Sequence, residues 1–165
     1  MYQSLYTGKQ VDEGAEYAVN PSLFCLKSNL DTPMNQTIAV VNTYQDVIFA
    51  NTDLLLNGNF SYDGDKVTYT GVENIDLELN MSCSVSSTQA NTKVYLGQDK
   101  NGVVDPGAET STLLLSTGET NSLNFATHFT MVTNDTLNLQ IKADKTAVIS
   151  MEHFQVFLSQ KKVTV

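Results

Sequence analysis

Eleven residues, from Ile75 to Val85, alternate strictly between apolar and polar side chains. The apolar positions are Ile75, Leu77, Leu79, Met81, Cys83 and Val85, and the polar ones are Asp76, Glu78, Asn80, Ser82 and Ser84. A β-strand points successive side chains to opposite faces, whereas a helix would scatter this pattern around its circumference. The run therefore predicts an antiparallel strand with one face on a core, where Cys83 is a small buried hydrophobe, and the other face exposed.

Short strand-like segments separated by turn residues fill the chain from about residue 36 onward. We expect strands at Ile38–Val41, Val47–Asn51, Asn59–Tyr62, Lys66–Thr70, Ile75–Val85, Thr92–Gln98, Ser111–Ser116, Ser122–Val132, Thr136–Ala143 and Ala147–Ser159. Turns are expected at Asn57-Gly58, Asp63-Gly64, Asn101-Gly102, Pro106-Gly107 and Thr117-Gly118. Asn-Gly and Asp-Gly provide the positive φ that tight hairpins require. The pattern predicts an all-β protein, an antiparallel β-sandwich.

The last predicted strand, Ala147–Ser159, changes parity near His153. Ile149 and Met151 share one parity, while Phe154 and Val156 continue on the other. Either a β-bulge shifts the register near His153, or both faces of the strand are covered. The second reading requires another molecule on the outer side of the sheet, and the sequence leaves both open.

Residues 1–35 follow a different pattern and predict an extended N-terminal arm. They contain scattered Gly and Pro residues, three tyrosines, and the apolar segment Leu23–Leu26, with no sustained period of 2 or 3.6 residues. We therefore expect two parts: an attachment arm at 1–35 and a sandwich domain at 36–165.

Charge argues against nucleic acid as a partner. The chain carries a net charge of −9, and its nine basic residues are all lysines, so it has no basic stripe to neutralise phosphates. It has no apolar run of 18 residues, so we expect no membrane span.

No reactive constellation is visible in the sequence. His128 and His153 lack metal-ligand spacing, and no Gly-x-Ser-x-Gly elbow is present. Asp99–Gly102 with Asp105 is similar to half of a calcium loop but lacks its other carboxylates, which favours a hairpin turn. We expect no catalytic residues, no metal site, no cofactor and no enzymatic activity; a hydrolase using Asp99 or Asp135 is a remote alternative.

Four segments carry a resemblance to the tumour necrosis factor/C1q-like jelly roll, in the versions found in bacteriophage virion proteins. They are Thr70-Gly71-Val72, Val94–Leu96 with Lys100–Val103, Val132–Leu137, and Phe154–Leu158. The first lacks the family's tyrosine after glycine, and the third has Asn134 where the family has glycine. The likeness covers about residues 36–160.

The resemblance implies a jelly roll that forms a homotrimer, with one sheet of each sandwich facing the threefold axis. Candidate trimer-interface residues are Tyr69, Phe154 and Phe157. It also implies a non-enzymatic virion protein, a capsid decoration (cement) or head-fibre protein at the capsid surface, assembled in the host cytoplasm. The partner would be the phage major capsid protein or another virion protein. Candidate attachment residues in the arm are Tyr2, Tyr6, Tyr17, Leu23, Phe24 and Leu26.

An alternative function is a receptor-binding fibre tip that recognises glycans. Sugar sites need exposed aromatic rings that stack on pyranose faces, and the chain has no tryptophan. Tyr44, Tyr62 and Tyr95 are the candidates for that role.

Overall fold

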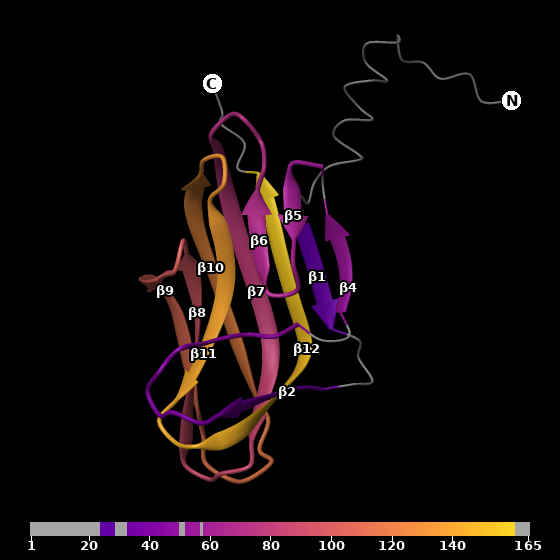
Figure 1. The fold of residues 1–165 in the computed structure, drawn as a ribbon. Helices are drawn as coiled ribbons and strands as arrows, with labels where there is room; N and C mark the ends of the chain where they lie inside the picture. The colour runs from indigo at the N-terminus through magenta and orange to yellow at the C-terminus, as the bar shows by residue number, and fades with distance from the viewer. Residues whose placement is uncertain (1–23, 29–32, 50–51, 57, 161–165) are drawn as a thin grey trace, which may run out of the picture.

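The computed structural model describes residues 24–28, 33–49, 52–56 and 58–160, with the backbone alone for 24–28 and 52–56. All regular elements among them are strands, which confirms the predicted all-β class (Figure 1). They are β1 (Phe24–Ser28), β2 (Met34–Ile38), β3 (Gln45–Asp46), β4 (Thr52–Leu56), β5 (Phe60–Tyr62), β6 (Lys66–Tyr69), β7 (Ile75–Ser87), β8 (Thr92–Lys100), β9 (Val103–Leu114), β10 (Asn121–Met131), β11 (Thr136–Ala143) and β12 (Ala147–Gln160).

Two six-stranded antiparallel sheets face each other as a sandwich (Figure 1). Sheet A has the order β10-β7-β12-β1-β4, and β2 pairs with the first half of β12. Sheet B has the order β5-β6-β11-β8-β9, and β3 pairs with β11. Neighbouring strands are mostly distant in sequence, as in a jelly roll. The segment from β2 to β3 crosses from sheet A to sheet B and connects them; we call it the strap.

The alternating run behaves as predicted. Strand β7 buries every second side chain from Ile75 to Ser87, and its intervening side chains are exposed or half-buried. Leu77, Leu79 and Val85 are fully buried, and Cys83 is 3% exposed. Burial raises the pKa of the Cys83 thiol to about 12, so it behaves as an inert hydrophobe.

Strand β12 contains a β-bulge, which was one of the two explanations offered for its change of parity near His153. Its pairing with β7 shifts between Glu152 and Gln155, and His153 has a φ of 51°. The extra residue moves Phe154 and Val156 onto the same buried face as Met151. The parity change is therefore explained within one chain, and it does not require a second molecule.

Three local predictions are wrong. Ile38–Val41 is not a strand, because β2 ends at Ile38. The described part of the predicted strand Val47–Asn51, residues 47–49, is irregular. Val40 and Val41 are exposed on the strap between the sheets. Pro106-Gly107 is not a turn either, since it lies inside β9. That strand is the edge of sheet B, where a proline can be accommodated without losing a ladder hydrogen bond.

Sheet A already includes β1, which precedes the predicted domain boundary at residue 36. Its backbone pairs with β12 on one side and β4 on the other. Phe24 is paired with Leu158, so β1 begins at the end of the sandwich where β12 finishes (Figure 1). Residues 1–23 lie outside the described residues.

Candidate functional site

The outer face of sheet A has an uncharged patch over its strands β10, β7 and β12. Residues paired directly across antiparallel strands share a face, so the register aligns two rows over β10, β7 and β12. The rows are Asn124–Ser82–Gln155 and Ala126–Asn80–Phe157. We call these six residues the neutral face. Charged residues flank it on three sides. Glu152 stands beyond one row, and Glu78, 3.7 Å from His128, stands beyond the other. On the β1 side, Gln155 is paired with Lys27, which is paired in turn with Asp53.

The neutral face is hollowed and mostly unsatisfied within the chain. A shallow depression of about 320 Å³ lies over Asn80, Ser82, Asn124, Ala126 and Phe157. Of the polar side chains of this face, only the Asn80 amide has a hydrogen-bond partner among the described residues, the Glu78 carboxylate at 3.2 Å. The polar groups of this face are therefore available to water or to another surface.

Strand β10, which lies beside β9 at the edge of the sandwich, carries two half-buried aromatic rings. Phe125 and Phe129 pair with Met81 and Leu77, so they point to the inner side of sheet A and pack against the core. Strand β10 is the edge of its sheet, and that edge does not cover them completely. The chain thus has an aromatic edge next to its neutral face.

The three predicted trimer-interface residues lie in different environments. Tyr69 is 3% exposed and donates a hydrogen bond from its hydroxyl to the Glu73 carbonyl at 2.6 Å. Phe154 is fully buried, and its ring centroid lies 5.2 Å from that of Phe49. Both contribute to the protomer core. Phe157, which is half-buried, lies on the outer face of sheet A, in the neutral face.

The predicted attachment residues are largely beyond the described part of the chain. Tyr2, Tyr6, Tyr17 and Leu23 lie outside it. Phe24 and Leu26 lie on β1, where the backbone alone is described.

The outer face of sheet B carries a connected polar network instead. The Asp46 carboxylate accepts hydrogen bonds from the amides of Asn138 (2.6 Å) and Gln140 (3.0 Å). Gln140 also donates to Asp99 (2.8 Å), whose other oxygen accepts the backbone N–H of Gly102 (2.6 Å). Asp99 is 5% exposed. A carboxylate so deeply buried is tolerated because each of its oxygens has a donor.

Two of the three candidate sugar-binding tyrosines meet on this same face. The Lys142 ammonium lies 4.1 Å from the ring centroid of Tyr44 and 4.6 Å from that of Tyr95. It also pairs with Glu109 at 3.2 Å, and the Tyr44 hydroxyl donates to the same carboxylate. Lys93 is 4.8 Å from the Tyr95 ring. Cations therefore already lie against the aromatic faces that a sugar would need.

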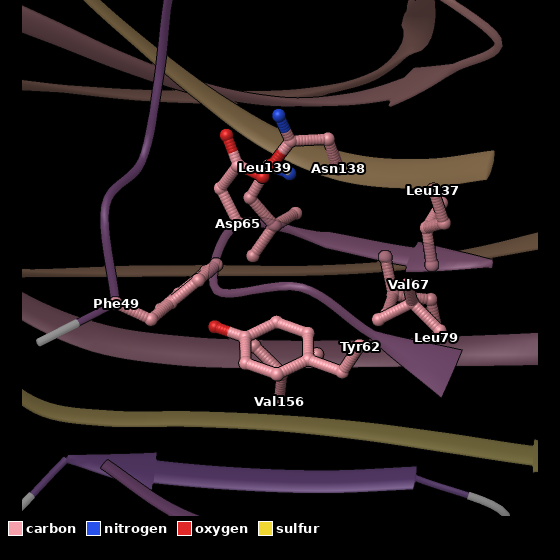
Figure 2. A pocket seen from close by; sticks show the side chains of 9 residues that line it. All are labelled: Phe49, Tyr62, Asp65, Val67, Leu79, Leu137, Asn138, Leu139 and Val156. Carbon is pink, nitrogen blue, oxygen red and sulfur yellow. Dashed lines mark hydrogen bonds between the residues drawn. The ribbon is translucent and has the colours of Figure 1, made fainter. Parts of the chain in front are cut away.

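Tyr62 lies elsewhere, at a small opening between the sheets (Figure 2). Burial, with help from Asp65 and Asp63, raises its pKa to about 12. The opening is lined mainly by core side chains, among them Phe49, Val67 and Val156, and its volume of about 20 Å³ accommodates about one water molecule. It is too small for a sugar or a substrate.

The turn between β10 and β11 is braced by one carboxylate. Asp135 pairs with the Lys100 ammonium at 2.8 Å and accepts hydrogen bonds from the Asn101 amide (2.7 Å) and the Val132 N–H (3.0 Å). These donors, with Lys100 first, lower the pKa of Asp135 to about 2. Asn101 and Gly102 have φ of 55° and 81°, which confirms the predicted hairpin.

The described residues offer little for catalysis. No three of their His, Cys, Asp or Glu side chains are grouped so that they could hold a metal ion. Asp99 and Asp135, the carboxylates considered for a hydrolase, are each committed to backbone and side-chain donors. Within the same residues, no helix is long and apolar enough to cross a membrane.

Comparison with known proteins supports the fold. No family model matches the chain, and no curated protein matches it. Among solved structures, the chain is similar to the tumour necrosis factor Eiger from S. frugiperda. The TM-score is 0.56 at 9% sequence identity, over 88% of this chain and 96% of that one. The two therefore share the tumour necrosis factor-like jelly roll.

Proposed function

We propose that the chain is a non-enzymatic, homotrimeric virion protein, a capsid decoration or head-fibre protein attached through its N-terminal segment. The observation that carries the trimer is the neutral face. A protein of net charge −9 repels its own copies, and interface cores are depleted in charge. Two copies that meet through an uncharged patch therefore repel each other less than copies that meet through charged surfaces.

A threefold contact also needs two different surfaces, because a ring closes through heterologous interfaces. The half-buried Phe125 and Phe129 at the sandwich edge supply the second surface. In the proposed trimer this aromatic edge of one protomer packs against the neutral face of the next. Burying two phenylalanine rings that are incompletely covered in the monomer favours association.

The virion location rests on the sequence resemblance to phage jelly-roll proteins. The fold agrees with it, and the opening between the sheets is too small for a substrate. The glycan-recognising alternative has less support. Tyr44 and Tyr95 do meet, but the ammonium groups of Lys142 and Lys93 lie against their rings. A glycan array would support this alternative if it gave a hit that Tyr44→Ala and Tyr95→Ala abolished.

The trimer is tested by placing one charge on either face of the sandwich. Ser82→Lys puts an ammonium in the neutral face, and Ser111→Lys puts the same group on the exposed outer side of β9. Light scattering should give three times the 18.1 kDa protomer mass for the parent and for Ser111→Lys. Ser82→Lys should raise the dissociation constant about 100-fold or more, because burying an unpaired charge costs several kcal/mol. A monomeric parent protein contradicts the proposal.

Attachment is tested with particles assembled without this chain. The parent trimer should bind them, and a variant lacking residues 1–22 should remain a folded trimer that does not bind. The truncation stops before Phe24 because β1 is part of sheet A. Retained binding by the truncated protein would show that the N-terminal segment is not the anchor.

A further inference from the structure

Strand β10 is an edge strand without the features that normally stop an edge from pairing. It pairs with β7 over its whole length of 11 residues without a register shift, and it contains no proline, glycine, lysine or carboxylate. The other edge strand on this side of the sandwich, β9, has Pro106, the carboxylates of Asp105 and Glu109, and a shift in its register with β8. Prolines, charges and bulges are the usual protection of a sheet edge. A long, regular edge that lacks them is suited to contact another polypeptide.

The hydrogen bonds at the end of β7 show which backbone groups of β10 point outward. The Ser87 carbonyl accepts the N–H of Gly118, which lies just before β10, at 3.0 Å. The next residue, Thr88, donates its N–H to the Val148 carbonyl of β12 at 3.1 Å. Odd-numbered residues of β7 therefore direct their N–H and C=O groups to β10, and even-numbered ones to β12. The register pairs odd with odd, so the even-numbered residues of β10 direct theirs away from the sheet.

Most of these outward backbone groups have no partner within the described part of the chain. They belong to Ser122, Asn124, Ala126, His128 and Thr130. Among the described residues, the one hydrogen bond that reaches them runs from the Lys100 ammonium to the Thr130 carbonyl, at 2.6 Å. The edge is open at its middle, because the inward side chains of Phe125, Thr127 and Phe129 are only half-buried, whereas those nearer its two ends are buried.

The neutral face has the kind of side chain that such an edge requires. A peptide group presents one donor and one acceptor, and a side-chain amide presents both as well. Asn124 and Gln155 place amides on the neutral face, and Ser82 places a hydroxyl between them. Neither surface has a charged side chain, so the two can meet in a protein of net charge −9 without bringing carboxylates together. An apolar surface would instead leave the peptide groups of the edge unsatisfied once water is excluded.

We propose that the neutral face of one protomer hydrogen-bonds the outward backbone of β10 in the next protomer, through Asn124, Gln155 and Ser82. The inference rests on the proposed trimer, and it names the side chains that recognise the second copy. Phe125 and Phe129 supply the apolar part of the same contact. The peptide groups that lose water in the interface regain partners there, which offsets the cost of removing that water.

Replacing an amide by an apolar group of the same shape tests this chemistry. Gln155→Met keeps the length of the side chain and removes its donor and acceptor, and Gln89→Met makes the same change at an exposed loop position outside both surfaces. Gln155→Met should raise the dissociation constant of the trimer about 10-fold, because peptide groups of the next protomer lose their partner. Gln89→Met should associate like the parent. A purely apolar contact would instead be strengthened by Gln155→Met, and that result would overturn the inference.

The edge itself is tested at Ala126, whose N–H points outward. Ala126→Pro removes this N–H without removing a bond to β7, and Ala126→Val has a side chain of similar size and keeps the N–H. The proline variant should associate about 10-fold more weakly than the valine variant, since one interface hydrogen bond is lost. Equal association of the two folded variants would contradict the proposed backbone contact. If the proline variant does not fold, Gln155→Met decides the question.

The mass of the parent separates this inference from the proposed function. If the parent is a monomer, the proposed trimer fails. If the parent is a trimer and Gln155→Met associates as tightly as the parent, the trimer stands and its recognition by amides is wrong. A parent of twice the protomer mass would show that two β10 edges pair with each other, and this would overturn both.

Hydrogen exchange gives a second readout, residue by residue. In the trimer, the outward amides of Asn124, Ala126 and His128 should exchange at least about 10-fold more slowly than in Ser82→Lys diluted to the monomer. The odd-numbered amides of β10 are bonded to β7 and should exchange slowly in both proteins. Equal exchange of the outward amides in trimer and monomer would show that the edge is not hydrogen-bonded in the interface.

Discussion

The outer faces of the two sheets are built from similar polar residue types but differ in how those residues are satisfied. On sheet B, the Gln140 amide bridges the carboxylates of Asp46 and Asp99, and Asn138 also donates to Asp46. Lys142 pairs with Glu109 on the same face. On sheet A, the side chains of Ser82 and Asn124 have no hydrogen-bond partner among the described residues. The first face is complete within one protomer, and the second is the one with room for a partner. Substitutions that affect folding should therefore concentrate on sheet B, and those that affect assembly on sheet A.

The largest difference is expected between two aspartates, one on each face. Asp99→Ala removes a buried carboxylate, leaves the Gly102 N–H without its acceptor and leaves the Gln140 amide with Asp46 alone. Its cost should be about 2–4 kcal/mol in urea-induced unfolding at fixed protein concentration. Asp76→Ala removes an exposed carboxylate that accepts only from the Thr130 hydroxyl, and should cost less than about 0.5 kcal/mol. Equal costs would contradict the contrast between the faces.

Acid should weaken the brace at the turn where the two sheets meet. The pKa of Asp135 falls from 3.8 to about 2 in the folded protein, so the folded state favours the carboxylate. Its contribution is complete well above pH 3.8 and is lost as the pH falls through about 2. The loss between pH 5 and pH 2 is on the order of 2 kcal/mol.

The measurement compares the parent with Asp135→Asn by urea unfolding at each pH. The variant should be less stable at pH 5, and the two unfolding free energies should converge by pH 2. Parallel pH curves would show that Asp135 does not have a lowered pKa.

Two glutamines test the same contrast more gently. Gln140→Ala removes the amide that joins Asp46 to Asp99, which leaves two carboxylates with fewer donors, and should cost about 1–2 kcal/mol of unfolding free energy. Gln155→Ala lies in the neutral face and should instead change the protein-concentration dependence of unfolding, as a change in association does. If Gln140→Ala altered the trimer mass while Gln155→Ala did not, the roles of the faces would be reversed.

How much of this could be predicted from the sequence depends on whether the signal is local. The alternation in β7 and the Asn101-Gly102 hairpin are local patterns, and both predictions are confirmed. The bulge at His153 was visible only as a parity change, and the paired strands were needed to distinguish it from a covered face. Only the last part of β9 was predicted, because Pro106 argued against a strand before Ser111. Proline is tolerated in an edge strand, and whether a strand lies at the edge is decided by the assembled sheet.

The two faces were harder to anticipate than the strands. Asp46 and Gln140 are 94 residues apart and meet because β3 pairs with β11. The neutral face depends on the order β10-β7-β12, which aligns Asn124, Ser82 and Gln155 in one row. Periodicity shows which side chains share a face of one strand, but the topology decides which strands lie side by side.

The smallest effect concerns how tightly the outer face of sheet B is packed. A methyl group at Gly97 would lie 3.3 Å from Cγ1 of Val104 and 3.4 Å from the Tyr44 hydroxyl. Gly97→Ala should therefore cost about 1 kcal/mol or less, because these side chains must shift slightly. In a Tyr44→Ala background the cost of the same substitution should be smaller, since only the contact with Val104 remains and alanine restricts the unfolded chain more than glycine does. On sheet A, Ser82→Ala should show no such dependence on Tyr44. A cost at Gly97 that was undiminished without Tyr44 would mean that the contact with Val104 alone causes it and that this tyrosine does not close the face of sheet B.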